Sequence, residues 1–304
     1  MPERRDLLWK YYARREDYLL AAKALSDLAL REGGMSLSER VYYLAQALTN
    51  AKSAASVGSE DVEFTTGLQE RIDVAQVQLE IVRAVEGHPD MSESEKVEPL
   101  EQLNSELLGL DDLYQHFARP LRLLEPILLI LKTADTRVED VCTAVWNQLL
   151  RQRAAQVPID ASVGELVTDL CRKYYPSEGA PADLVLPLVY TEAAPHRDTT
   201  APGWATEAML AGGVGLRDLW DVATLMHDEA PAEDREYFAE EAAAVISAWL
   251  KNASGPGLQH DLPPADVEHF ASAYLLRTQG AALDARRSET RKVMNAAKSA
   301  AARF

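Results

Sequence analysis

Two adjacent acidic residues, Asp111 and Asp112, begin the part of the sequence that comes closest to a known catalytic motif. The run from Asp111 to Gln115 approaches the DDxxD element with which all-helical terpenoid synthases hold magnesium and diphosphate. A magnesium site needs carboxylates that converge with substrate phosphates, but Gln115 replaces the last carboxylate and no second acidic element has suitable spacing. We therefore interpret the run as acidic residues at the start of a helix, where the helix dipole favours negative charge. An all-α magnesium-dependent enzyme is kept as a remote alternative.

Other potentially reactive residues lack the neighbours that they would need. The run Gly212–Gly215 has neither GxGxxG spacing nor the Lys-Ser/Thr of a P-loop, so it predicts a turn between helices. No serine lies in a GxSxG elbow. The histidines form neither an HExxH motif nor a Cys/His quartet, so we expect no metal and no cofactor. The sequence places them at His88, His116, His196, His227, His260 and His269, and His227 is interpreted as part of a solvated helix end.

The two cysteines, Cys142 and Cys171, are predicted to be unpaired buried thiols in a reducing compartment. A cysteine nucleophile would need a histidine base close to it, which the sequence cannot place. We therefore interpret both as small buried hydrophobic residues, assign no catalytic residue and expect that the chain is not an enzyme.

Large aromatic residues recur in a second half that is otherwise rich in alanine and acid. Core packing is their ordinary role, but large aromatic side chains also anchor peptide-binding grooves. The segment from Leu216 to Trp220 could line such a groove together with a helix over 232–252. The residues predicted to bind a partner are Leu216, Leu219, Trp220, Tyr237 and Trp249.

These residues need helices to position them, and apolar periodicity predicts helices from the start of the chain. A candidate capping box, Ser36 with Glu39, opens the second helix. The stretch 60–85 is apolar on two faces, so that helix should pack on both sides, as stacked helical pairs do. The opening stretch carries one apolar stripe, which indicates one long helix with one buried face. That stripe consists of Leu8, Tyr11, Tyr18, Ala22, Leu25 and Ala29.

The second half is cut into shorter helices, because thirteen of the fifteen prolines lie between 99 and 264. No window alternates apolar and polar residues as a strand does, so the fold class is all-α. No repeat consensus recurs, which predicts an irregular α-helical solenoid of stacked antiparallel helices, about 12 to 15 in number. The stretch 193–203 is the best internal loop. Helices are expected at 92–108, 110–118, 120–132, 136–154, 160–174, 182–192, 203–212, 216–229, 232–252, 264–277 and 280–302.

Composition sets limits on the partners. With 26% charged and 47% hydrophobic residues the chain is an ordinary folded protein. Its net charge of -17 opposes binding to nucleic acid, which relies on Lys and Arg. No apolar stretch is long enough to span a bilayer, and the N-terminus lacks the apolar region of a secretion signal. The basic last helix, over 280–302, lacks the bulky apolar face of membrane-binding helices and is interpreted as a solvated helix or a contact to an acidic partner.

Several blocks of the first half resemble a known family in order and approximate spacing. The blocks are Trp9–Tyr12 with Tyr18 and Ala21–Ala22, then Leu37–Ala45, Arg71–Leu79, and Leu103–Leu107 leading into Leu113–Pro120. Together they are similar to the large scaffold nucleoporins of the nuclear pore inner ring. Members of that family join an N-terminal β-propeller to a C-terminal α-helical solenoid.

The resemblance implies that residues 1–304 form a single solenoid domain, cut from a longer protein whose propeller is absent. It implies a structural scaffold at the nuclear pore complex in the nuclear envelope, which supports nucleocytoplasmic transport. The implied partners are linker nucleoporins, bound through short linear motifs, and other inner-ring scaffold nucleoporins. No direct contact with nucleic acid, and no membrane contact from this part, is expected. A helical stack from a vesicle coat or tethering complex is the alternative, because such proteins share this architecture.

Overall fold

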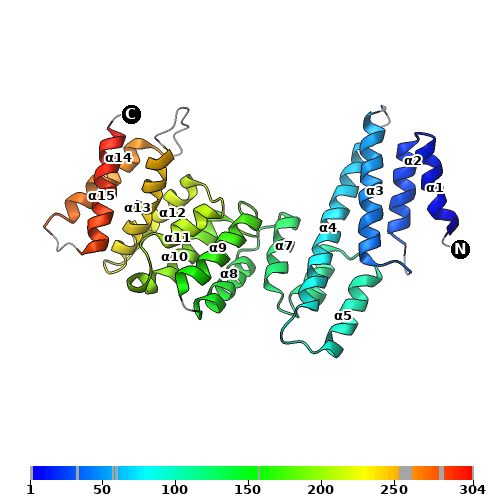
Figure 1. Ribbon diagram of the computed structural model, residues 1–304, viewed down its shortest axis with the longest axis horizontal. Helices are drawn as coiled ribbons and strands as arrows, with labels where there is room; N and C mark the ends of the chain where they lie inside the picture. Colours follow the sequence, from blue (N-terminus) through cyan, green and yellow to red (C-terminus); the bar gives the residue numbers. More distant parts are fainter. Residues whose placement is uncertain are drawn as a thin grey trace. The chain divides into compact units, whose positions relative to one another are not determined.

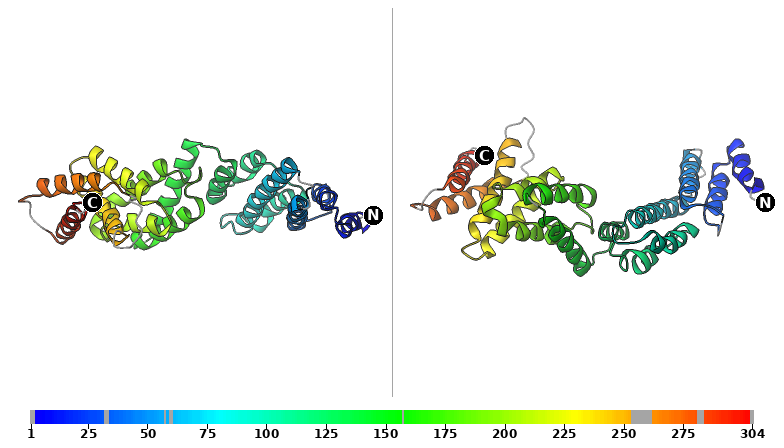
Figure 2. Two further views of the ribbon diagram at one scale, coloured as in Figure 1. Left: turned by 90° about the horizontal axis from the view of Figure 1, so that it is seen from above. Right: turned by 60° about the horizontal axis from the view of Figure 1, so that its bottom comes forward.

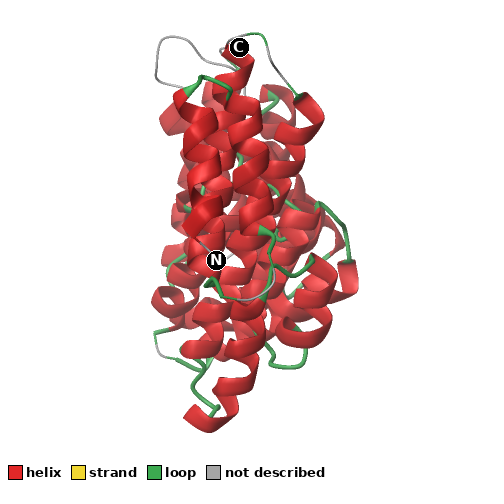
Figure 3. Ribbon diagram, turned by 90° about the vertical axis from the view of Figure 1, so that its right-hand side faces the viewer, coloured by secondary structure: helices red, strands yellow, loops and turns green. Residues whose placement is uncertain are grey.

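A computed structural model describes residues 3–31, 34–56, 58, 61–156, 158–252, 262–280 and 284–302. Within those ranges the chain forms fifteen α-helices, one 3-10 helix and one π-helix, and no strand (Figure 3). This confirms the predicted all-α class. The chain divides into two compact units, Met1–Thr136 (unit 1) and Arg137–Phe304 (unit 2), and each is described by itself.

Unit 1 is built from helices that pack on their neighbours in sequence, α1 on α2, α2 on α3 and α3 on α4 (Figures 1 and 2). The helix α4 also contacts α5, α7 and the π-helix. The elements are α1 (Glu3–Arg14), α2 (Tyr18–Ala29), α3 (Leu37–Ser56), α4 (Val62–Glu86), α5 (Glu93–Ser105), α6 (Leu110–Asp112), the π-helix η1 (Leu113–Ala118) and α7 (Leu124–Ala134).

The prediction of one long opening helix is wrong, because the chain breaks between α1 and α2. Glu16 adopts a positive φ of 60°, which an α-helix cannot contain, and the Asp17 side chain accepts a hydrogen bond from the Leu20 amide at the new helix start. The apolar stripe is therefore divided between two helices. Leu25 is buried on α2, whereas half of Tyr11 on α1 is exposed.

The two-faced helix and the capping box are confirmed. One face of α4 places Leu68 in a core shared with α2 and α3, and another face buries Val77 and Ile81. At the start of α3 the Ser36 amide donates to Glu39 Oε2 over 2.8 Å, and the Glu39 amide donates back to Ser36 Oγ over 3.3 Å. The Ser36 amide, together with the Ser36 hydroxyl that donates to the same oxygen over 2.8 Å, holds the pKa of the Glu39 carboxyl below its usual value.

Unit 2 is built from α-helices of 8 to 18 residues, close to the predicted ranges. Helix α13 packs against α11, α12 and α15. Close packing of α9 on α11 requires Gly212, since a Cβ there would lie 2.6 Å from Cys171 Cβ. The elements are α8 (Glu139–Ala154), α9 (Ile159–Tyr174), α10 (Ala182–Ala193), the 3-10 helix η2 (Ala194–Thr199), α11 (Trp204–Ala211), α12 (Leu216–Glu229), α13 (Arg235–Asn252), α14 (Pro264–Arg277) and α15 (Ala285–Ala301).

The segment 193–203, predicted as a loop, is mostly the 3-10 helix η2, and hydrogen bonds to two helices hold it in place. Arg197 on η2 donates to Glu240 on α13. Arg286 on α15 donates to the carbonyl oxygens of Arg197 and Thr200, over 2.7 Å in the second case. The segment is therefore tied to both α13 and α15.

Candidate partner-binding surfaces

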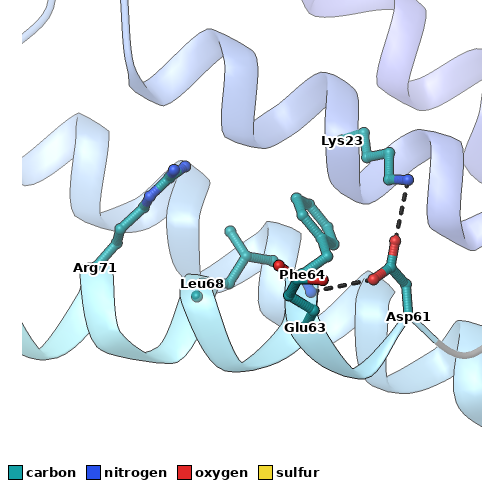
Figure 4. Close-up of a pocket in the computed structure, with 7 residues that line it drawn as sticks. Lys23, Asp61, Glu63, Phe64, Leu68 and Arg71 are labelled. Carbon is teal, nitrogen blue, oxygen red and sulfur yellow. Dashed lines mark hydrogen bonds and ion pairs between the residues drawn. The ribbon is translucent and has the colours of Figure 1, made fainter.

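A groove runs along one face of α4 in unit 1, beside α2 (Figure 4). Its first cavity, of about 310 Å³, has Leu68 as a buried apolar floor and Phe64 as a half-buried wall. Lys23 from α2 lies 3.1 Å from Asp61 and 5.5 Å from the centre of the Phe64 ring. Asp61 in turn caps α4, because its side chain accepts a hydrogen bond from the Phe64 amide over 3.1 Å. The residues that line the cavity are Lys23, Asp61, Glu63, Phe64, Gly67, Leu68 and Arg71.

A second cavity, of about 390 Å³, continues the groove along the same helix, and Arg71 lines both. Figure 4 shows Phe64 and Arg71 on the side of α4 that faces α2. The second cavity adds apolar side chains from the end of α2 and from the segment between α5 and α6. Its lining residues are Leu30, Glu70, Arg71, Val74, Ala75, Leu107, Leu108 and Gly109.

Two buried polar side chains fix the walls of this groove, and the first is Gln78 on α4. Gln78 is fully buried, and its amide nitrogen donates to the carbonyls of Leu103 over 2.6 Å and Glu106 over 2.8 Å. Its oxygen accepts the Leu108 amide over 3.0 Å, so its hydrogen-bonding groups are satisfied by the end of α5 and the segment that follows it. The wall formed by Leu107 and Leu108 is therefore anchored to α4 itself.

Arg40 on α3 anchors the opposite wall of the groove, which the end of α2 forms at Leu30. Only 1% of this residue is exposed, and its guanidinium donates to the carbonyls of Ala29, Arg31 and Ser105. These carbonyls lie at or just beyond the ends of α2 and α5, where a helix leaves acceptors without partners and its dipole favours a cation. One side chain thus positions the ends of two helices that border the groove.

In unit 2 the five residues predicted to bind a partner are brought together, but in the core. Leu216, Leu219 and Trp220 lie on α12, which packs against α13, the helix that carries Tyr237 and Trp249. Their exposed fractions run from 0% to 9%. Core packing is thus their observed role. A contact with a partner stays a prediction, and it requires these side chains to become accessible.

Unit 2 also buries two adjacent carboxylates on α13, which the sequence did not reveal. Glu240 has a fully buried side chain between Arg197, at 2.6 Å, and Arg286, at 2.8 Å. Because each carboxylate oxygen meets one guanidinium, the charge is compensated inside the unit. This cluster joins η2, α13 and α15.

Glu241, the second carboxylate, forms no ion pair with any of the described residues. Its Oε2 accepts the Thr206 amide over 3.0 Å, and Thr206 Oγ1 lies 2.8 Å from the Tyr190 hydroxyl. Burial raises the pKa of Glu241 to about 7 and raises the pKa of Tyr237 well above its usual value. These four residues form a buried polar cluster in which Glu241 titrates near neutral pH.

A shallow groove between α9 and α11 has an acidic rim. Its cavity, of about 710 Å³, is lined by Gly164 and Trp204, and Trp204 ring carbons lie 3.9 Å from the position of a Cβ on Gly164. Arg172 pairs with Asp169 over 3.0 Å, which leaves an excess of acid along the lining. The carboxylates there belong to Asp160, Glu165, Asp169 and Glu207.

The residues that approached chemical motifs lie apart. Asp111 and Asp112 are exposed on α6, and in the described part of the chain no three His, Cys, Asp or Glu side chains gather as a metal site would require. Gly213 has a φ of 92° in the turn between α11 and α12, where the sequence predicts a turn. Cys142 and Cys171 are unpaired and buried, and burial raises their pKa values to about 11 and about 12.

The histidines are scattered along the chain, and His260 lies outside the described residues. The solvated role expected for His227 is wrong, because only 12% of its side chain is exposed. Its ring packs edge-on against Phe270, and its Nε2 lies 2.9 Å from Arg277 Nη1. Burial lowers the pKa of His227, which favours the neutral ring.

The α4 groove was missed at the level of the sequence, although Phe64, Leu68 and Arg71 lie in stretches that the sequence singled out. The one local signal was Gly67, a glycine in the interior of a long helical pattern.

Over the described ranges, no helix combines the length and the apolar character needed to cross a membrane.

Comparison with known proteins identifies the family. The family model described as "Non-repetitive/WGA-negative nucleoporin C-terminal" matches residues 1–285. "Probable nucleoporin C890.06" of Schizosaccharomyces pombe is 27% identical over 276 residues, which cover 86% of this chain and 21% of that protein. "Nuclear pore complex protein Nup154" of Drosophila melanogaster is 33% identical over 153 residues, 48% of this chain and 11% of that protein. The matched region is thus only a small part of each of these relatives.

A solved structure shows the same fold. The Nup170 CTD–Nup145N complex of Chaetomium thermophilum matches with a TM-score of 0.81 at 19% identity, covering 98% of this chain and 63% of that chain. This likeness confirms the predicted α-helical solenoid. The family match favours the nucleoporin prediction over the vesicle-coat and magnesium-enzyme alternatives. The chain belongs to the family of non-repetitive nucleoporins, in the C-terminal region that its family model describes, and is a protein of the nuclear pore complex.

Proposed function

We propose that this chain is the solenoid part of an inner-ring scaffold nucleoporin and that it binds a linear segment of a linker nucleoporin. The observation that carries the proposal is the family match over residues 1–285, together with the fact that a protein of the same fold is solved with Nup145N. A stacked-helix surface suits such a role, since grooves between neighbouring helices accept short segments. In this proposal residues 1–304 act as one solenoid domain of a longer protein with an N-terminal β-propeller.

The proposed role is architectural and not catalytic. The two thiols are poor candidates for nucleophiles, because the thiolate is the reactive form and burial raises both pKa values. The net charge of -17 disfavours nucleic acid as a direct partner. Other inner-ring scaffold nucleoporins are proposed as further partners, and no membrane contact is proposed for this region.

A pull-down tests this function. The purified chain is immobilised and exposed to overlapping peptides that tile the linker nucleoporins of the same organism, with peptides of the same composition but scrambled order as controls. Retention of a contiguous set of overlapping peptides is the expected result. Equal retention of native and scrambled peptides would contradict the proposal.

The contact between α12 and α13 remains the binding location proposed from the sequence, with Trp220 as its central residue. Trp220→Ala should abolish peptide retention if partners bind there. Trp220→Phe keeps an aromatic ring against Phe270, whose ring centre lies 5.4 Å from that of Trp220, and so controls for loss of core packing. Full retention by Trp220→Ala, with unchanged circular dichroism, would exclude this location.

A further inference from the structure

Gly67 is a glycine inside the 25-residue helix α4, and nothing in unit 1 that the structure describes requires it. Apart from its two chain neighbours and the adjacent backbone of α4, no atom of the described residues lies within 4 Å of a Cβ built on Gly67. Glycine in a helix interior lowers helix stability relative to alanine or glutamine. The chain therefore carries a cost at this position without a packing gain inside unit 1.

Gly67 lines the first cavity of the α4 groove, among the side chains that shape it. Phe64 lies about one turn before it, Leu68 is next to it and Arg71 lies about one turn after it. A missing Cβ lets another main chain approach the helix backbone closely. The open space over Gly67 thus suits an extended segment that crosses α4.

The charges along the groove define the chemistry of that segment. Lys23 is already paired with Asp61, whereas the exposed Arg71 has no ion pair among the described residues. Because Arg71 lines both cavities, a carboxylate bound to it would sit at their junction. Glu63 and Glu70, which also line the groove, would repel a second carboxylate.

The walls are fixed by contacts within the chain. Gln78 holds the segment that carries Leu107, and Arg40 holds the end of α2 beside Leu30. Apolar side chains on both sides of Arg71, Phe64 in one cavity and Leu107 in the other, can each receive an apolar side chain. A preformed groove loses little conformational entropy on binding.

We propose that the α4 groove is the docking site for an extended linker-nucleoporin segment in which two apolar residues flank a single acidic residue. The segment passes over Gly67, packs one apolar side chain on Phe64 and Leu68, pairs its carboxylate with Arg71 and packs the second apolar side chain against Leu107. This inference rests on the proposed function, because it names the site at which that partner binds.

Gly67→Gln provides the first test. The probe is the overlapping peptide that the immobilised wild-type chain retains most strongly. The added side chain fills the cavity, so the Kd should rise about tenfold or more. The same substitution removes a helix-interior glycine, so the Tm should rise by about 2 °C. A glycine needed only for folding would give a lower Tm instead, and an unchanged Kd would overturn the proposal.

Thr66→Gln is the matched control, since Thr66 is exposed on α4, adjacent in sequence and not part of the groove lining. It adds a similar side chain to a different face of the same helix. Its Kd should stay within about twofold of the wild type. An equal loss of binding in Thr66→Gln would contradict the assignment of the groove.

Charge reversal tests the role of Arg71. Arg71→Glu should raise the Kd about tenfold, and a probe peptide whose acidic residue is changed to lysine should regain binding to Arg71→Glu but not to the wild type. If the probe binds wild type and all variants equally, the proposed function stands and this site is wrong. If no peptide binds the wild type, both the function and the site are wrong.

Discussion

The two compact units bury opposite kinds of polar side chain. In the described part of unit 1 the buried long polar side chains are the donors Arg40, Gln78 and Lys96, and all three donate to backbone carbonyls. In the described part of unit 2 the buried charged residues are the carboxylates Glu240 and Glu241. The helices of unit 1 thus obtain donors for carbonyls at their ends, whereas the helices of unit 2 are joined through acids that accept hydrogen bonds from other elements.

This difference implies different sensitivity to pH. Glutamine has no titratable group, so the anchoring of unit 1 by Gln78 does not change with pH. Glu241 in unit 2 has a pKa raised to about 7 by burial, so its charge changes in that range. Substitutions in both units test whether buried donors and buried acids differ in this way.

Glu240→Ala should give the largest loss, roughly 4 kcal/mol of unfolding free energy, because it leaves the Arg197 and Arg286 guanidiniums without their shared carboxylate. Tryptophan fluorescence during urea unfolding is the measurement. It reports mainly on unit 2, since four of the five tryptophans lie there. They are Trp146, Trp204, Trp220 and Trp249.

Glu233→Ala is the matched control for this loss, because it removes an exposed carboxylate from the same unit. Its unfolding free energy should differ from that of the wild type by less than about 0.5 kcal/mol. If both variants unfold at the same urea concentration, the cluster of Arg197, Glu240 and Arg286 does not stabilise unit 2.

Glu241→Gln should remove a pH dependence from unit 2. Because burial raises the pKa of Glu241 from 4.5 to about 7, its stabilising contribution is complete below pH 4.5 and is lost as the pH rises through 7. The difference between wild type and variant should therefore change by about 3 kcal/mol between pH 4.5 and pH 8. Parallel urea titrations over this pH range measure it.

The comparison with the variant is needed because His227 in the same unit acts with the opposite sign. Burial lowers the pKa of His227, so its contribution is present above its ordinary pKa of 6.5 and is lost as the pH falls below that value. His227 is unchanged in Glu241→Gln, so its effect cancels in the difference. Parallel curves for the two proteins would show that Glu241 keeps one charge state throughout.

Arg40→Met should lower the unfolding free energy of unit 1 by about 2 kcal/mol. Methionine has no hydrogen-bond donor, so the carbonyls of Ala29, Arg31 and Ser105 lose the hydrogen bonds that Arg40 gives them. Hydrogen exchange read by mass spectrometry should show faster exchange at the ends of α2 and α5. The tryptophan-reported transition of unit 2 should stay in place. Faster exchange confined to unit 2 would contradict the role assigned to Arg40.

Ser36→Ala should have the smallest effect, about 1 kcal/mol, because it removes one of the two capping-box hydrogen bonds at the start of α3. The pKa of Glu39, which the Ser36 amide and then the Ser36 hydroxyl hold below its usual value, should rise in part, because the hydroxyl is lost while the amide remains. Carboxyl chemical shifts followed through an NMR titration of Glu39 report it. An unchanged pKa would mean that the Ser36 hydroxyl does not donate to Glu39 in solution.

The sequence was most informative where structure is decided locally. The Ser36–Glu39 box and the prolines of the second half mark helix starts through main-chain chemistry that involves a few neighbouring residues, and these positions were predicted closely. The two apolar faces of α4 were also readable, because periodicity records burial directly. The break at Glu16 was missed, since the apolar spacing continues through it from Tyr11 to Tyr18.

The buried charges and the groove could not be predicted in the same way. Arg40, Glu240 and Glu241 belong to residue types that usually lie on the surface, and only their distant partners account for their burial. The aromatic residues of α12 and α13 were considered for a binding site because of their size, which core packing explains equally well. The α4 groove depends on elements far apart in sequence, and Gly67 alone hinted at it.

Hydrogen exchange of the chain, measured with and without the overlapping peptide that it retains most strongly, is the decisive test of the α4 groove. It locates the partner without any substitution. We expect slower exchange in two places, residues 62–75 of α4 and residues 105–109 after α5, with α12 and α13 unchanged. Slower exchange confined to α12 and α13 would place the partner at Trp220 instead. That result would contradict the assignment of the α4 groove as the binding site.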